Sequence, residues 1–233
     1  MPACLLSASF FLSLRWLVLL LFFAPFSANA TPPNLLIGHI RHPHMEPIKS
    51  LLKEAYAQLN IDVSFLETPM ERERLLAANG TIDGIAVRFG AMAEELKGVV
   101  MVDAPIMRIR VHLICRLHIP CHASMLNDPK NSIAVPFGAS IVTRLLSTYQ
   151  AKPIFLSYNQ QVINMIKDGK IDYGFTAVDP DSSHTLVGIQ IAEPPVYDDL
   201  AYHFISERYA WLAPSLANAI LQAKQATPLT SPE

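Results

Sequence analysis

The side chain best placed to do chemistry is that of Arg88. It follows a short apolar run, residues 82–87, which is long enough for a buried strand. Ligands of open α/β sheets bind near the carboxyl ends of such strands. A guanidinium is always charged, and its planar fork of N–H groups matches a carboxylate through two parallel hydrogen bonds. The position therefore predicts a carboxylate site; the alternative is a surface arginine that balances Glu94 or Glu95.

Two groups of histidines suggest a metal site as another possibility. His39, His42 and His44 lie around one predicted loop, and His118 and His122 have i, i+4 spacing. The second pair lies in a segment interrupted by proline, which we do not expect to be helical. Neither group has the ligand set of a structural zinc site. We therefore expect no metal and no cofactor.

Catalysis requires a nucleophile or a tuned acid and base. The sequence contains no G-x-S-x-G, P-loop or H-E-x-x-H motif. We expect a binding protein rather than an enzyme, and a small enzyme stays open as the alternative.

The elements that must position Arg88 begin at Thr68. Thr68, Pro69 and Glu71 have the spacing of a capping box, with proline at the first helical position. Gly80 suits the end of that helix because glycine tolerates a left-handed backbone. The stretch therefore predicts a helix, a tight turn and a strand that ends at Arg88.

The same pattern occurs a second time. Residues 79–83 (NGTID) are echoed by residues 168–172 (DGKID), and each copy follows a helix-like segment and precedes an apolar strand. Predicted strands at 63–66 and 153–156 precede the two helices. Two β-α-β elements indicate two α/β lobes of similar design, although a turn followed by Ile-Asp is also common after helices in general.

The remaining elements alternate between strands and helices. Cations and apolar residues alternate at 108–116, which is typical of a strand with one wet face, and we place a crossover between lobes there. Apolar periodicity and turn residues predict further strands at 34–40, 61–66, 132–136, 171–178, 186–191 and 200–205, and helices from Pro47, from Ser140, from Asn159 and at 214–224.

The composition suits one large or two small globular domains. The chain has 233 residues, 51% hydrophobic and 16% charged, and its net charge of −2 gives no reason to expect a nucleic-acid partner. Residues 1–30 contain a single charge, Arg15, then an apolar run at 16–23 and an A-x-A sequence. That arrangement is typical of a secretory signal peptide cleaved before Thr31. The alternative is a retained membrane anchor, since residues 4–26 are almost all apolar.

Two cysteines, Cys115 and Cys121, lie outside the predicted signal peptide. An exported protein meets an oxidising setting, so a disulfide between them is one possibility. A buried thiol at Cys115 is the other, and the sequence does not decide between them.

The order of elements and four phrases resemble the type II periplasmic solute-binding proteins, in the group that binds amino acids and similar polar solutes (solute-binding family 3). The phrases are ERERLLAANGTIDG, VPFGAS, NMIKDGKIDYGF and YHFISERYAWLAPSLANAI. The resemblance implies an α/β fold of two lobes joined by two crossover strands. Lobe 1 would be 31–109 completed by 204–233, and lobe 2 would be 110–203. A solute would bind between the lobes, which would close around it.

The resemblance also implies which residues bind the solute. Arg88 matches an arginine that often clamps a solute carboxylate. Ser140 matches a helix N-terminus in lobe 2, where a hydroxyl and free N–H groups meet the carboxylate. His42 and His44 stand where the family usually offers an aromatic ring, and an imidazole there could stack or confer pH sensitivity. The alternative for both histidines is a solvated loop.

The chain departs from the family at the aspartate that binds an amino group. That position falls on Ala177, and Asp179 or Asp181 just beyond it could substitute. Without an acid there, an α-ammonium loses its charge partner. An amino acid, another carboxylate or a different polar solute therefore all stay open.

Together the residues and the resemblance predict a monomeric periplasmic protein that captures a small polar, carboxylate-bearing solute between two lobes. It would serve uptake through an ABC-type membrane permease or delivery to a membrane sensor. A dehydratase-like enzyme of the same fold is the alternative.

Overall fold

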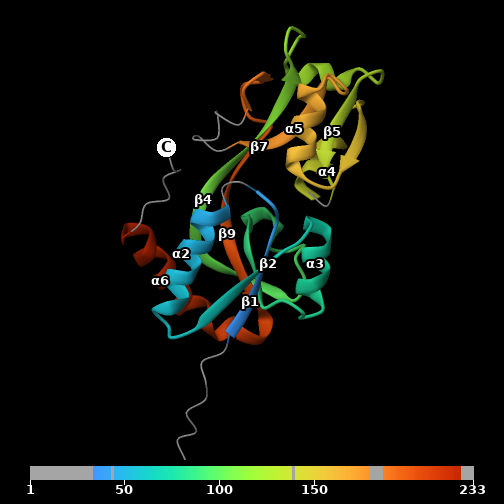
Figure 1. Cartoon of the computed structure of the whole chain (residues 1–233). Coiled ribbons are helices and arrows are strands. Elements are labelled where there is room, and N and C mark those ends of the chain that lie inside the picture. Colours follow the sequence, from blue (N-terminus) through green and yellow to red (C-terminus); the bar gives the residue numbers. More distant parts are fainter. Residues whose placement is uncertain (1–33, 43–44, 138–139, 179–185, 227–233) are drawn as a thin grey trace, which may run out of the picture. The chain divides into compact units, whose positions relative to one another are not determined.

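The computed structural model describes residues 34–42, 45–137, 140–178 and 186–226. They form an α/β fold around one mixed sheet with the strand order β2-β1-β3-β9-β4-β7-β5-β6, and β8 pairs with β4 (Figure 1). The predicted signal peptide at 1–30 and its cleavage site before Thr31 lie outside the described residues. Within the described ranges, no helix is long and apolar enough to cross a membrane.

The strands are β1 (Asn34–His39), β2 (Asp62–Glu67), β3 (Gly84–Phe89), β4 (Val99–Arg116), β5 (Ser132–Pro136), β6 (Lys152–Leu156), β7 (Tyr173–Val178), β8 (Ile189–Ile191) and β9 (Tyr197–Ser206). The α-helices are α2 (Met45–Ala57), α3 (Met70–Ala78), α4 (Ser140–Leu146), α5 (Asn159–Lys167) and α6 (Ala213–Ala226), and short 3-10 helices are η2 (Gly90–Met92), η3 (Ala123–Asn127) and η5 (Glu207–Leu212).

The first half of the sheet has helices on both faces. Strands β1, β2 and β3 are parallel, and alternate residues of β1 enter different cores. Leu35 and Ile37 pack with α2 and with the C-terminal helix α6, which lie together on one face (Figure 1). Leu36 packs on the other face with Ala77 of α3. The C-terminal helix therefore completes the core of the first half.

The second half repeats this arrangement. Strands β5, β6 and β7 are parallel. Ile133 and Val135 of β5 pack in a core that contains α4 residues, whereas Ala134 between them packs in a core with α5 residues. Each half is thus a parallel three-stranded unit with helices on both faces. Its inner strands are near-continuous buried apolar runs, whereas the edge strands β2 and β6 are largely exposed.

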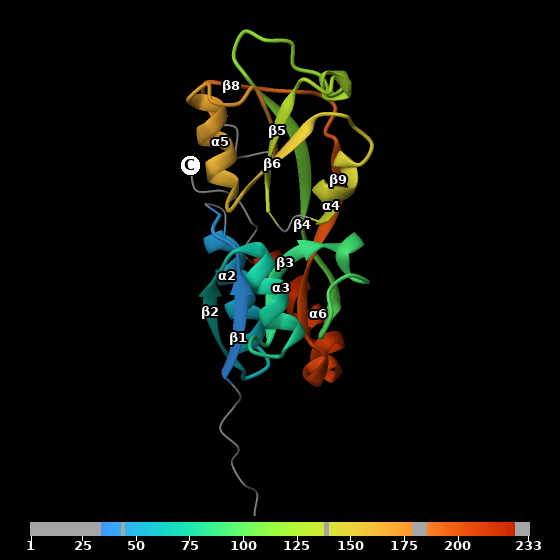
Figure 2. The same cartoon turned by 90° about the vertical axis from the view of Figure 1, so that its right-hand side faces the viewer.

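Two long antiparallel strands connect the halves. β4 has 18 residues and pairs with β9 from Val99 opposite Ser206 to Val111 opposite Tyr197, with register shifts near Pro105 (Figure 2). β9 also pairs with β3, and β4 also pairs with β7. The sequence predicted a strand at 108–116; β4 begins earlier, at Val99, because register shifts accommodate Pro105.

The two turns that the sequence predicted to be equivalent adopt the same geometry. In the first, Gly80 has a φ of 72° and the N–H of Thr81 donates to Leu76 O at 2.9 Å. In the second, Gly169 has a φ of 66° and the N–H of Lys170 donates to Met165 O at 3.0 Å. Glycine is favoured at both sites because the left-handed backbone strains other residues. The predicted internal repeat is confirmed.

The aspartate that follows each turn fastens its unit to a long strand. Asp83 Oδ2 accepts from the N–H of Leu36 at 2.8 Å, Asp83 Oδ1 accepts from Arg208, and Asp83 O accepts from the N–H of Ser206 at 2.7 Å. Asp172 Oδ1 and O both accept from Arg116, at 2.7 and 2.9 Å. Asp83 is buried, whereas Asp172 is exposed.

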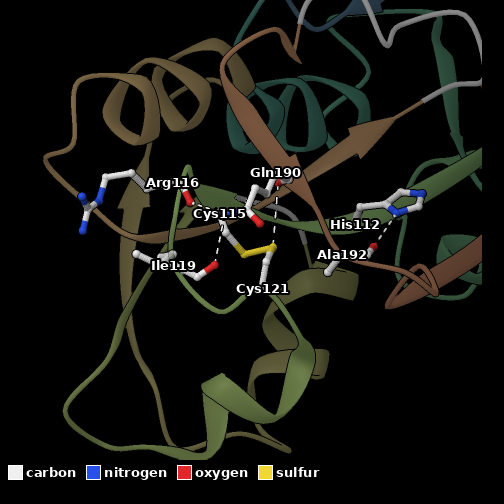
Figure 3. The surroundings of a disulfide bond; sticks show 7 residues. All are labelled: His112, Cys115, Arg116, Ile119, Cys121, Gln190 and Ala192. Atoms are coloured by element: carbon white, nitrogen blue, oxygen red, sulfur yellow. Dashed lines mark hydrogen bonds between the residues drawn. A yellow bond between two sulfur atoms is a disulfide. The ribbon is translucent and has the colours of Figure 1, made fainter.

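Cys115 and Cys121 form a disulfide with Cα atoms 5.7 Å apart (Figure 3). The loop that it closes is held by Gln190, whose Nε2 donates to the carbonyl oxygens of Arg116 and Ile119, each at 3.0 Å. Of the two possibilities that the sequence left open, the structure has the disulfide.

Two local predictions were wrong. Helix α3 has no side-chain hydrogen bond at its N-cap, because the Thr68 N–H donates to His39 O at 2.9 Å and Thr68 thereby continues the pairing of β2 with β1. Glu71 pairs with Arg74 at 2.5 Å instead of closing a capping box. His112, expected on the wet face of its strand, is buried because the segment after β8 covers it, and His112 Nδ1 donates to Ala192 O at 3.1 Å.

Replacing the two equivalent aspartates will separate their roles. Asp83→Ala should lower the free energy of unfolding by about 2–3 kcal/mol, because it leaves the partly buried N–H of Leu36 without its acceptor and removes an ion pair. Asp172→Ala, the matched control, should cost less than about 1 kcal/mol because its pair is exposed. Urea denaturation of both variants measures the difference. Equal losses of the free energy of unfolding would show that the hydrogen bonds of Asp83 stabilise the fold no more than those of Asp172.

Candidate functional site

A cavity of about 110 Å³ lies where the carboxyl ends of β1, β3, β5 and β7 approach one another. One water needs roughly 10–15 Å³ of such space, so the cavity has room for a small molecule. Loops and helix starts that follow parallel strands usually provide the groups that bind ligands. The cavity therefore occupies the position expected of a binding cleft.

Residues from both halves and from β4 line this cleft, and most of their side chains are apolar. The first half contributes Ile40, His42, Met45, Ile48, Met70, Val87, Arg88, Phe89 and Met92; β4 contributes Met107, Ile109 and Val111; and the second half contributes Pro136, Ile141, Val142, Asn159, Phe175, Thr176 and Ala177. Among the described residues that line the cleft, only Arg88 carries a permanent charge.

Arg88 is the penultimate residue of β3, so its side chain lies at the carboxyl end of the strand as the sequence predicted. It is only 6% exposed, and its Nη1 donates to Val87 O at 2.8 Å. Its Nη2 donates to Oε2 of Glu73, a residue of α3 that is completely buried. The alternative of a surface arginine paired with Glu94 or Glu95 is therefore wrong; Glu95 pairs with Arg144 at 3.0 Å.

Glu73 sits in an unusual electrostatic environment. Within the described part of the chain, its Oε1 is buried and has no hydrogen-bond partner. Burial raises the pKa of Glu73 to about 7, because the loss of hydration opposes the charge more strongly than the nearby Arg88 guanidinium favours it. The Glu73 carboxyl therefore gains or loses its proton close to neutral pH.

A buried series of hydrogen bonds connects β3, the strand that carries Arg88, to His203 and Tyr56. His203 Nδ1 lies 2.8 Å from Ile85 O, which can only accept, so Nδ1 carries a proton. His203 Nε2 then accepts from the Tyr56 hydroxyl at 2.7 Å. Complete burial lowers the pKa of His203 to about 4, and burial also raises the pKa of Tyr56. Both groups thus stay neutral across the physiological pH range.

The other predicted site residues divide into three groups. His42 is half-buried and lines the cleft. Ser140 is the first residue of α4, beside the lining residue Ile141, but its side chain is not among the described parts. His44 and Asp179 lie outside the described residues, as does Asp181. Ala177, which replaces the family's aspartate, does line the cleft.

The histidines considered as metal ligands differ in their surroundings, as far as they are described. His39 is buried, and its Nδ1 lies 2.9 Å from Ile40 O, whereas His118 and His122 are exposed in the loop after β4. In the portion that the structure describes, no three His, Cys, Asp or Glu side chains come together as metal ligands.

Sequence reasoning missed Glu73, the residue in direct contact with the predicted key arginine. The alternating charges of ERER gave a weak signal, since Glu71 and Arg74 pair along the helix surface at 2.5 Å while Glu73 points inward. Only the packing of α3 against β1 and β3 makes the distinction. Asn159 and Thr176, two further polar lining residues, were likewise not predicted.

Comparisons with solved structures show which proteins share this architecture. The sensor domain of a histidine kinase with similarity to periplasmic binding proteins superposes with a TM-score of 0.72 at 11% identity, over 85% of this chain and 93% of that chain. The substrate-binding protein AbpA of an amino acid ABC transporter from Streptococcus pneumoniae, bound to L-arginine, gives 0.69 at 13% identity over 84% and 91%. The ancestral amino acid-binding protein AncCDT-1, a precursor of cyclohexadienyl dehydratase, gives 0.68 at 15% over 84% and 92%.

These similarities define the class of architecture. The chain has the two-lobed α/β fold of type II periplasmic binding proteins, which confirms the fold that the sequence resemblance implied. Neither the comparison with protein-family models nor the comparison with curated proteins gives a match. Identities this low carry the fold alone, so the function must be argued from the cleft.

Removing Arg88 should destabilise the protein in a pH-dependent way. At pH 8 Arg88→Ala leaves the buried Glu73 carboxylate without its partner, which typically costs about 3–5 kcal/mol. At pH 5 the loss should be much smaller, because Glu73 with a pKa near 7 is already protonated in the folded parent. Denaturant titrations at both pH values measure these free energies of unfolding.

Arg144→Ala provides the control for this measurement. It removes an exposed arginine whose partner Glu95 is also partly exposed, so it should cost less than about 1 kcal/mol at either pH. If Arg88→Ala proves as mild as this control at pH 8, the buried pair does not contribute to the fold as described.

Proposed function

We propose that the protein is a solute-binding protein that holds a small solute in this cleft and leaves it chemically unchanged. The observation that carries the proposal is the composition of the cleft, in which side chains from both halves surround one buried arginine. Ligand sites in proteins are typically apolar concavities with a few placed polar groups. The fold shared with amino-acid-binding and sensor proteins supports the same conclusion.

The solute that fits this lining carries an apolar body and one carboxylate. Met107, Ile141 and Phe175 offer apolar contact area, and burial of apolar surface contributes about 25 cal/mol per Å². Arg88 supplies the cation that a carboxylate needs. Two of its N–H groups are engaged by Glu73 and Val87, and its remaining N–H groups can face the solute.

The described lining offers no anionic partner for an α-ammonium group. No aspartate or glutamate is among the described residues that line the cleft, and Ala177 stands where the family places an acid. A buried ammonium without an anion is costly. We therefore favour a simple carboxylate over an amino acid, with Ser140, His42 and His44 as its proposed contacts. Asp179 is kept as a proposed contact only for a solute that carries an ammonium group.

The connection between the halves suits a closing motion. β4 and β9 are the two strands that pass between them, and hinge motions are absorbed at a few positions in such connections. We propose lobe 1 as 31–109 completed by 204–233 and lobe 2 as 110–203. Closure of these lobes on the solute would exclude water from Arg88 and strengthen its ion pair.

The proposed setting is the periplasm. The signal-like segment at 1–30 supports export, and the disulfide is of a kind that forms in oxidising compartments. The bound solute would pass to a membrane permease of ABC type or to a membrane sensor, and the protein would work as a monomer.

A thermal-shift series with one shared apolar body will test the function. We expect 4-methylpentanoate to raise the free energy of unfolding by about 2.7 kcal/mol at a hundredfold excess over its Kd. The isosteric amide 4-methylpentanamide and leucine should bind more weakly, since the first lacks the charge and the second adds an unpartnered ammonium. Mass analysis should recover 4-methylpentanoate unchanged. Turnover of any member would favour an enzyme, and no shift by any member would reject the proposed solute class.

Arg88→Lys tests the anchor without removing the charge. Lysine keeps a partner for Glu73 but lacks the planar fork, so the affinity for 4-methylpentanoate should fall by about tenfold or more, which is about 1.4 kcal/mol. Isothermal titration measures the change, with Arg144→Lys as the control that should bind like the parent. Unchanged affinity in Arg88→Lys would place the solute elsewhere.

Export has its own test. Expression of the full chain in a Gram-negative host should give a mature protein in the periplasmic fraction that begins at Thr31. N-terminal sequencing reads the start directly. A membrane-bound product that retains Met1 would support the anchor instead.

A further inference from the structure

We propose that Glu73 and Arg88 form a proton-coupled anion site: Glu73 competes with the solute carboxylate for the Arg88 guanidinium, and the solute binds together with one proton that neutralises Glu73. This inference rests on the proposed solute-binding function and concerns a residue that the sequence resemblance does not assign. Glu73 is a positioning residue here, because it acts on the solute through Arg88.

The geometry places one cation between two anion positions. Arg88 lines the cleft, while its Nη2 donates to Glu73 on α3, which is not among the lining residues of the cleft. With the pair intact the site carries no net charge. A solute carboxylate that reaches Arg88 would bring a second negative charge to a single cation in a region with little access to water, and two carboxylates that share a site raise the pKa of one of them.

Glu73 cannot relieve this conflict by turning to solvent. It is completely buried, and it packs so closely on β1 that a Cβ at Gly38 would lie 3.0 Å from Glu73 Cγ and 2.6 Å from Ile82 Cδ1. Glycine at this position is what allows α3 to approach the strand. The carboxyl group is therefore fixed beside Arg88 and can lose its charge only by taking up a proton.

Few other charged groups lie close enough to Glu73 to control its protonation. Arg88 on β3 is the charged group that acts on it, and on its own helix Glu71 and Arg74 pair with each other. On β1 the residue against it is Gly38, and in the turn after α3 Asp83 pairs with Arg208. His42 is a histidine among the described lining residues, so its contribution must be controlled.

The protonation is also accessible under ordinary conditions. Burial already raises the pKa of Glu73 to about 7 in the unliganded protein. A solute anion therefore has to shift the equilibrium only slightly at neutral pH, and increasingly at higher pH. A neutral solute would bring no charge to Arg88 and would show no such linkage.

Isothermal titration of 4-methylpentanoate into the parent at pH 6, 7 and 8 tests the inference. The ligand carboxylate is ionised throughout, so its Kd should weaken by about tenfold between pH 6 and pH 8 as Glu73 becomes harder to protonate. At pH 8, titrations in buffers of different ionisation enthalpy should detect about one proton taken up per ligand bound. This proton count needs no variant and so does not depend on whether a substitution folds.

Variants then assign the proton. Glu73→Gln should bind 4-methylpentanoate with a Kd that is independent of pH and, at pH 8, about tenfold or more tighter than that of the parent, since Arg88 no longer has a competing anion. Glu71→Gln on the same helix is the matched control and should behave as the parent does. His42→Gln should keep the pH dependence; if it abolishes it, the proton belongs to His42 and the inference is wrong.

The remaining outcomes separate this inference from the proposed function. Binding of 4-methylpentanoate with a pH-independent Kd and no proton uptake would overturn the role of Glu73 while leaving solute binding intact. Absence of binding at every pH, in the parent and in Glu73→Gln, would remove the proposed solute class and this inference with it.

Discussion

The antiparallel pairing of β4 with β9 is the constraint on which the rest of the fold depends. β9 gives its other edge to β3, and β4 gives its other edge to β7, so both parallel units are attached to this central pair. Because each unit presents the carboxyl ends of its strands to the same region, the pairing also fixes where a cleft can form. Arg88 lies opposite Tyr202 of β9, so the pairing of β3 with β9 determines where Arg88 lies.

The sequence predicted those parts of the fold that local chemistry determines. The turns at Gly80 and Gly169 were recognisable because a left-handed residue after a helix has few acceptable identities. Asp83 and Asp172 follow these glycines at the same spacing. Asp83 accepts a hydrogen bond from β9, and Asp172 accepts one from β4. The capping box predicted at Thr68 does not form, because the Thr68 N–H donates to His39 O in a neighbouring strand. No local sequence pattern predicts such a long-range hydrogen bond.

The candidate site shows the same division between local and long-range information. The position of Arg88 at the end of β3 could be predicted, since it depends only on where one strand ends. Its pairing with Glu73 could not be predicted, because four consecutive charged residues of α3 look alike in the sequence and only the packed helix buries one of them. The apolar character of the cleft was also missed, because its lining comes from segments far apart in the chain.

A buried ion pair is weak evidence for stability, since desolvation of two charges often cancels their attraction. Here the desolvation of Glu73 outweighs the attraction of Arg88, which is why the pKa of Glu73 rises rather than falls. The unpartnered Oε1 adds to that cost among the contacts that the structure describes. Apolar residues of similar size would fill the space between α3 and β3 without this penalty. A cation that must stay charged and reachable at the cleft wall needs a counter-ion in the empty state. Glu73 provides that counter-ion, and in the proposed site a proton cancels its charge when the solute binds.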